Sequence, residues 1–175
     1  MKKYMVILSA AAVSAVLTGC VKNYAEEGVK YLEKGKYKEA AEQFEKAVEA
    51  DRNVGDAFRG IGMAKWEQED YEGARDAFKE ALDNGVEKTG AIYNLLGSCE
   101  MKLNDPQGAL SYYRLALSAE DSSKELLKEV KYNMIAAYEQ SKDWESARAK
   151  LKEYIAEYPD DETAGKEAEF LETRQ

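Results

Sequence analysis

The stretch YAEEGVKYLEKGKYKEAAEQFEKA, residues 24–47, decides the fold of this chain. Small and large apolar residues recur in it at the spacing of one face of an α-helix. The stretch therefore predicts two helices that pack against each other. The residues that define this unit are Tyr24, Gly28, Tyr31, Tyr37, Ala40, Phe44 and Ala47.

The same unit recurs three more times along the chain. Its central alanine returns at Ala40, Ala74, Ala109 and Ala147, in steps of 34, 35 and 38 residues. Other columns keep the same steps, and a fixed period over several columns indicates an internal repeat. These columns are Tyr37, Tyr71, Pro106 and Trp144; Phe44, Phe78, Tyr113 and Leu151; and Gly28, Gly62, Gly97 and Ile135.

The repeated glycines indicate close helix packing. A glycine inside a helix costs about 1 kcal/mol relative to alanine, so its presence needs a reason. We expect the first helix of each unit to approach its neighbour too closely for a side chain. Large residues such as Phe78 and Tyr113 would then fill the space between the helices.

The period and the order of these residues resemble the tetratricopeptide repeat, over roughly residues 21–161. The resemblance implies an all-α solenoid of four helix-turn-helix repeats. We expect the repeats at 21–54, 55–88, 90–123 and 128–161, with one longer helix from Lys124 to Gln140. Residues 162–175 would form a C-terminal capping helix, in which Ala164, Ala168, Phe170 and Leu171 cover the end of the stack.

Several helix boundaries are marked by residue type. Asp70, Asp105 and Asp143 stand where a carboxylate can cap free backbone N–H groups. Pro106 would occupy a first helical position, where its missing N–H is not needed. Asn84-Gly85 would end the second helix of the second repeat.

The N-terminus predicts export and a lipid anchor. Lys2 and Lys3 precede an apolar run, Met5–Leu17, that is shorter than the about 20 residues of a spanning helix. Leu17-Thr18-Gly19-Cys20 resembles the lipobox of bacterial lipoproteins. That resemblance implies cleavage of residues 1–19 and lipidation of Cys20. The alternative is an ordinary secretory signal in which the cysteine occurs by chance.

Composition argues against several other functions. The net charge of −9 disfavours nucleic-acid binding, and the chain has no histidine to serve as a base or a metal ligand. We found no metal-site, P-loop or nucleophile-elbow motif, so we expect no catalytic residue, no metal and no cofactor apart from lipid on Cys20. Cys99 is interpreted as a small buried thiol between helices.

By the same resemblance, the first helix of each repeat lines a concave groove. The residues expected to face a protein or peptide there are Arg59, Met63, Trp66, Asn94, Ser98, Met101 and Tyr132. Apolar anchors beside a few polar groups suit an extended peptide or a partner helix. Trp66 and Met101 fit equally well as packing residues between adjacent helices.

These observations predict a lipid-anchored scaffold that mediates protein–protein interaction at the bacterial cell envelope. Its site would be the outer membrane of a Gram-negative cell or the outer face of a Gram-positive plasma membrane. Two alternatives remain open at this stage: an assembly factor for outer-membrane proteins or pili, and an envelope enzyme. The sequence identifies neither the partner nor the oligomeric state.

Overall fold

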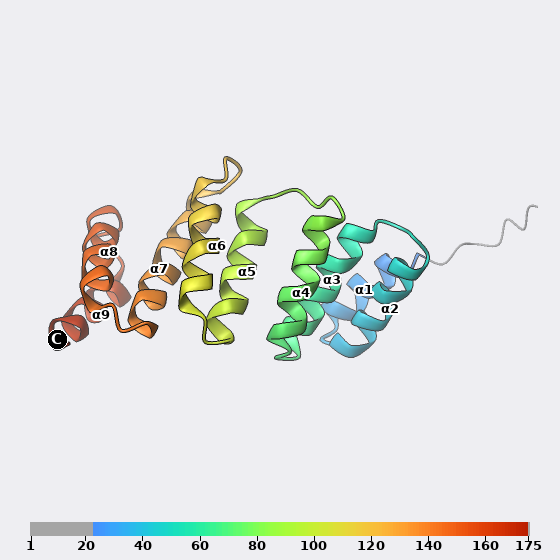
Figure 1. The fold of residues 1–175 in the computed structure, drawn as a ribbon, viewed down its shortest axis with the longest axis horizontal. Coiled ribbons are helices and arrows are strands. Elements are labelled where there is room, and N and C mark those ends of the chain that lie inside the picture. Colours follow the sequence, from blue (N-terminus) through green and yellow to red (C-terminus); the bar gives the residue numbers. More distant parts are fainter. Residues whose placement is uncertain (1–22, 175) are drawn as a thin grey trace, which may run out of the picture.

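A computed structural model describes residues 23–174, which form an elongated row of antiparallel helix pairs (Figure 1). Every regular element in this part of the chain is an α-helix. Successive helices pack on their neighbours in chain order, which is the arrangement of an α-solenoid. The helices are α1 (Tyr24–Glu33), α2 (Tyr37–Glu49), α3 (Val54–Glu67), α4 (Tyr71–Asp83), α5 (Gly90–Lys102), α6 (Pro106–Ser118), α7 (Lys124–Gln140), α8 (Trp144–Glu157) and α9 (Glu162–Glu172).

The four pairs α1–α2, α3–α4, α5–α6 and α7–α8 are the four repeats, and α9 follows as the cap. The fold class expected from the sequence is therefore confirmed. The longer α7 covers Lys124–Gln140, as the sequence predicted.

Side-chain caps fix the starts of the second helices in the last three repeats, α4, α6 and α8, whereas α2 begins after Lys36 without such a cap. The Asp70 carboxylate accepts a hydrogen bond from the N–H of Gly73 at 3.0 Å. Asp105 and Asp143 accept equivalent bonds at 2.9 and 3.1 Å from residues three positions ahead. Pro106 is the first residue of α6. These caps were predicted, and each is worth about 1 kcal/mol to its helix.

The repeated glycines lie against the repeated aromatic rings. A Cβ atom on Gly62 would stand 2.6 Å from the ring of Phe78, and one on Gly97 would stand 2.4 Å from the ring of Tyr113. Phe78 and Tyr113 are fully buried. The close approach expected from the sequence is confirmed, because any side chain at either glycine would collide with a packed core.

The junction between the second and third repeats differs from the other two. The loop from α4 to α5 spans residues 84–89, whereas residues 50–53 connect α2 to α3 (Figure 1). Over residues 23–174, α1 contacts α3 and α5 contacts α7, but α3 and α5 share no comparable contact. The first helices of these two repeats therefore stand apart.

A buried carboxylate joins α4 to α5 at this junction. Glu100 is 7% exposed, and its two oxygens lie 4.0 and 3.8 Å from the cationic groups of Arg75 and Lys79. The ammonium of Lys102 also lies 5.5 Å from the ring centre of Tyr71. Polar and ionic contacts thus supply part of the interface between the second and third repeats.

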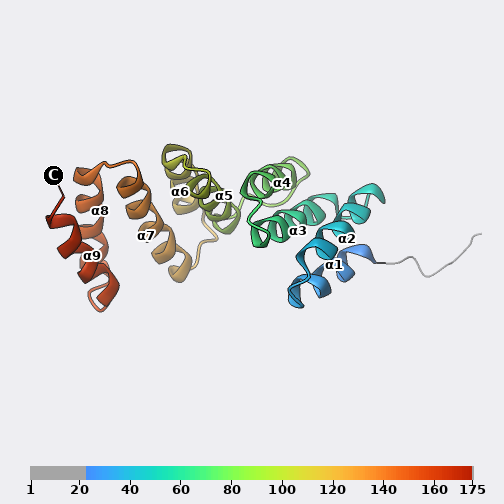
Figure 2. The same ribbon diagram turned by 90° about the horizontal axis from the view of Figure 1, so that it is seen from below.

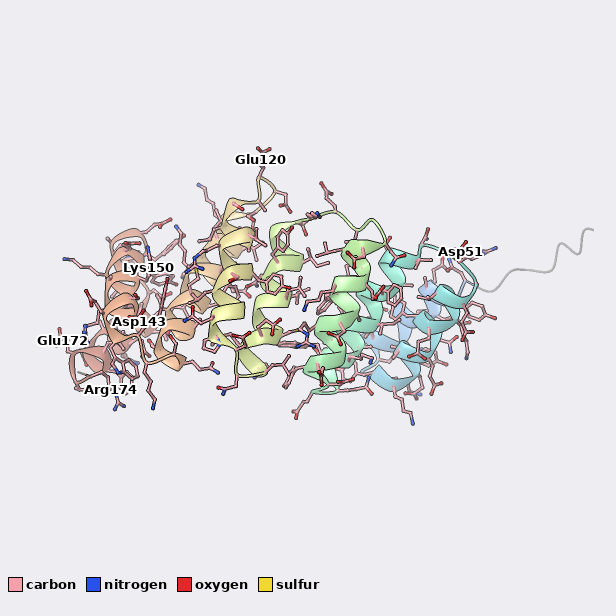
Figure 3. The ribbon with its side chains drawn as sticks, viewed as in Figure 1. Asp51, Glu120, Asp143, Lys150, Glu172 and Arg174 are labelled. Atoms are coloured by element: carbon pink, nitrogen blue, oxygen red, sulfur yellow. The ribbon has the colours of Figure 1, made fainter. Side chains whose placement is uncertain are left out.

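The C-terminal helix covers the end of the last repeat. Ala164 and Leu171 of α9 are buried, in agreement with the sequence. Phe170 is 41% exposed, so the prediction that it covers the stack is wrong. Its ring instead lies 4.2 Å from the guanidinium of Arg174, at the C-terminal end of the row (Figure 3).

The predicted signal segment 1–19 and the lipidation site Cys20 lie outside the described residues. Among residues 23–174, no helix combines the length and the apolar character that a membrane span requires.

Candidate functional site

Two adjoining hollows lie between α3 and α5, with volumes of about 590 and 320 Å³. Met63 of α3 and Leu95 of α5 line both hollows, so the two hollows adjoin, and the pair is here called the α3–α5 groove. The first hollow is also lined by Val54, Asp56, Arg59, Val86, Glu87, Thr89, Ala91 and Ile92, among others. The second is also lined by Leu32, Tyr37, Trp66, Glu67 and Phe78.

The long α4–α5 loop opens this groove. Gly85 takes a left-handed backbone conformation with φ +88°, which suits glycine, and turns the chain away from α4. The following residues, Val86 and Glu87, reach the rim of the first hollow. Gly55 lets α3 pass directly beneath the loop, because a Cβ there would stand 2.7 Å from the carbonyl oxygen of Asn84.

The centre of the groove is apolar and accessible. Met63 is 46% exposed, although it lies in the middle of a helix whose other apolar residues are mostly covered. Trp66 is half-buried: its ring packs on the cluster around Phe78 and meets Tyr71 edge-on, with ring centres 5.0 Å apart. Trp66 therefore combines the two roles that the sequence left open, packing residue and groove wall.

Charged groups stand at the two ends of the groove. Arg59 pairs with Asp56 at 2.9 Å, and both side chains are half-exposed. Glu87 lies on the loop side, and Glu67 lies at the far end beside Tyr37. The negative charge of Glu67 and a hydrogen bond to its carboxylate raise the pKa of Tyr37.

Comparison with known families decides the classification of this array. Profiles of the tetratricopeptide repeat match residues 26–85 and 59–125, and a second such profile matches residues 129–161. The chain belongs to the tetratricopeptide repeat family. Comparison of the chain with curated protein sequences gave no significant match.

Several solved structures share the fold. One is YrrB, described as a tetratricopeptide repeat protein with an unusual peptide-binding site. It matches with a TM-score of 0.70 and 22% sequence identity, and the match covers 85% of this chain and 74% of YrrB. Another is MamA of Desulfovibrio magneticus, with a TM-score of 0.74 and 16% sequence identity. The match covers 86% of this chain and 82% of MamA. A third is the first repeat domain of Spaghetti (RPAP3) bound to an HSP90 peptide, with a TM-score of 0.57 and 22% sequence identity. The match covers 65% of this chain and 91% of that domain.

Three of the seven predicted groove residues, Arg59, Met63 and Trp66, line the α3–α5 groove. The fourth, Asn94, is only 6% exposed. Its amide donates to Glu129 at 2.8 Å and accepts from Asn133 at 3.1 Å. Asn94 thus connects the first helices of the third and fourth tetratricopeptide repeats. It is buried and is not the accessible polar group that the sequence suggested.

The other three predicted residues contribute to packing within and between repeats. Ser98 hydrogen-bonds Tyr113, whose pKa is nevertheless raised by burial. Met101 packs on the cluster that contains Tyr113, and the ring of Tyr132 lies 5.5 Å from that of Tyr154. None of the three lines either hollow of the α3–α5 groove.

Leu95 and Val86 line the groove but were not among the predicted residues. Leu95 directly follows Asn94, a position that the resemblance assigns to the concave side, and Val86 lies in the loop before α5. The sequence signal that could have indicated a different junction here is the step of 35 residues from Ala74 to Ala109, where the preceding step is 34. That extra residue falls at the junction where α3 and α5 separate.

Cys99 is fully buried, as the sequence predicted. Burial, together with the negative charge of Glu100, raises the pKa of its thiol to about 12. A thiol of this kind stays protonated and is a poor nucleophile. No group of three side chains placed to hold a metal occurs in residues 23–174.

A carboxyl pair lies between α7 and the cap. Glu139 of α7 faces Glu167 of α9, and burial followed by the charge of Glu167 raises the pKa of Glu139 to about 7. Its Oε1 atom is buried without a hydrogen-bond partner. Raised carboxyl pKa values occur in catalytic and in structural carboxyl pairs alike. The Glu139–Glu167 pair lies outside the α3–α5 groove.

Proposed function

We propose that this chain is a lipid-anchored scaffold of a bacterial cell envelope that binds a segment of a partner protein in the α3–α5 groove. The observation that carries the proposal is the accessible apolar centre of the groove around Met63. Binding energy at protein interfaces concentrates in a few such residues that a partner can cover. Peptide binding by the similar YrrB and RPAP3 repeat domains supports the same role.

The anchor part of the proposal rests on the N-terminal motif. Cys20 stands three residues before Asn23, whose side chain caps the start of α1. Lipidation at Cys20 would therefore hold the repeats close to the bilayer, with little tether between them. Two or more acyl chains are needed for stable anchoring, which matches the modification of bacterial lipoproteins.

The Met63→Glu substitution is expected to reduce partner capture at least tenfold, because it places a charge in the apolar centre of the groove. The measurement is mild crosslinking in native membranes, followed by quantification of the captured protein. Leu115→Glu is the matched control, since Leu115 is 44% exposed on α6. Equal capture by both variants would show that the partner binds another surface.

The Cys20→Ser substitution is expected to move the protein from the detergent phase to the aqueous phase in phase partitioning. The serine hydroxyl does not receive the thioether-linked lipid. A variant that stays with the membrane would contradict lipid anchoring at Cys20, whatever the result for the groove.

A further inference from the structure

We propose that the α3–α5 groove selects a protein segment that carries apolar residues in its centre and lysine or arginine at its ends. This preference rests on the proposed function of the groove as a binding site. The preference follows from the positions of the carboxylates that line the groove and from the ion pair between Arg59 and Asp56.

The charge of the groove lining is negative. Asp56 and Glu87 belong to the first hollow and Glu67 to the second, whereas Arg59 is the cation among the residues that line the two. Arg59 lies 2.9 Å from Asp56, so their charges offset each other. Glu67 and Glu87 therefore face an incoming ligand with no cation of the groove to neutralise them.

The order of the groups along the groove predicts the order of groups in the ligand. Met63 and Leu95 line both hollows and so stand between them. Glu87 lies beyond them on the side of the α4–α5 loop, and Glu67 lies beyond them toward α1. A bound segment would place apolar side chains on Met63 and Leu95 and its basic groups near the two glutamates.

The dimensions and the overall charge agree with a segment of this kind. The two hollows, of about 590 and 320 Å³, lie in the size range of clefts that bury a ligand. The net charge of −9 adds a general attraction for cationic partners and repels acidic ones.

The test uses two labelled peptides that share two central leucines and carry either lysines or glutamates at both ends. Binding to the full chain in detergent solution is followed by fluorescence anisotropy at physiological salt. We expect the lysine peptide to bind at least tenfold more tightly than the glutamate peptide. Equal affinities, or no binding of either peptide, would overturn the proposed preference.

Two double variants separate local contacts from total charge. Glu67→Gln with Glu87→Gln is expected to weaken the lysine peptide about threefold to tenfold, the range for two partly exposed ion pairs. Glu42→Gln with Glu45→Gln, on the exposed face of α2, makes the same change of charge and is expected to alter affinity less than twofold. Equal losses in both variants would overturn the local contact.

Failure of this inference is distinguishable from failure of the groove function. The segment crosslinked in native membranes can be sequenced by mass spectrometry. A captured segment rich in acidic residues, with capture still lost in Met63→Glu, would refute the basic preference and retain the groove as the binding site.

Discussion

The Phe78→Ala substitution is expected to lower the free energy of unfolding by about 3–5 kcal/mol. Phe78 is fully buried, and its ring fills the space that Gly62 leaves between α3 and α4. It also packs with Ile92 and Leu96 of the next repeat. Removing the ring would leave a cavity at the junction of two repeats, which a rigid helix pair fills only in part. The measurement is urea denaturation followed by circular dichroism.

Phe170→Ala is the matched control for this prediction. Phe170 is 41% exposed, so the same chemical change is expected to cost about 1 kcal/mol or less. A loss of similar size in both variants would contradict the role assigned to the glycine–aromatic contact.

The Glu139→Gln substitution is expected to stabilise the protein by about 1–2 kcal/mol at pH 8 and by little at pH 4. Burial and Glu167 raise the pKa of Glu139 from 4.5 to about 7. Such a shift corresponds to at most about 3 kcal/mol, and partial exposure of the pair reduces the effect. A neutral glutamine removes the repulsion and offers an N–H to the Glu167 carboxylate.

The sign follows from proton linkage. A raised carboxyl pKa leaves stability intact below pH 4.5, where both folded and unfolded chains are protonated, and reduces it as the pH rises to about 7. Wild type should therefore lose stability across this interval relative to Glu139→Gln. The measurement is thermal unfolding at pH 4, 6 and 8, with Glu45→Gln on α2 as control. A difference between the variants that does not change with pH would refute the raised pKa.

The sequence was sufficient to predict the architecture, because the repeat period, the glycine–aromatic columns and the helix caps are local signals. Asp70, Asp105 and Asp143 mark helix starts by their chemistry alone. Gly62 and Gly97 mark close packing because their cost within a helix needs a compensating contact. The exposure of Phe170 was not predicted, since helical spacing does not fix which residue at a chain end is covered.

The groove was predicted only in part. Arg59, Met63 and Trp66 line the groove and follow from the regular repeat, whose first helix the resemblance assigns to the concave side. Whether Asn94 is free depends on the neighbouring helix, which supplies Glu129 and Asn133 as hydrogen-bond partners. Leu95 becomes part of the groove because α3 and α5 separate, and that separation depends on the spacing of two repeats rather than on the sequence of either.

The same separation has a consequence for how the array responds to load. In a repeat protein, each unit is coupled only to its neighbours, so the weakest interface limits cooperativity. Of the three interfaces between repeats, α4–α5 has the least contact, and it contains the buried ion pairs of Glu100. We therefore expect the first two repeats and the remainder to behave as two blocks in series. Among the interfaces between repeats, this junction is therefore expected to yield first to tension along the row, and the groove beside it would widen.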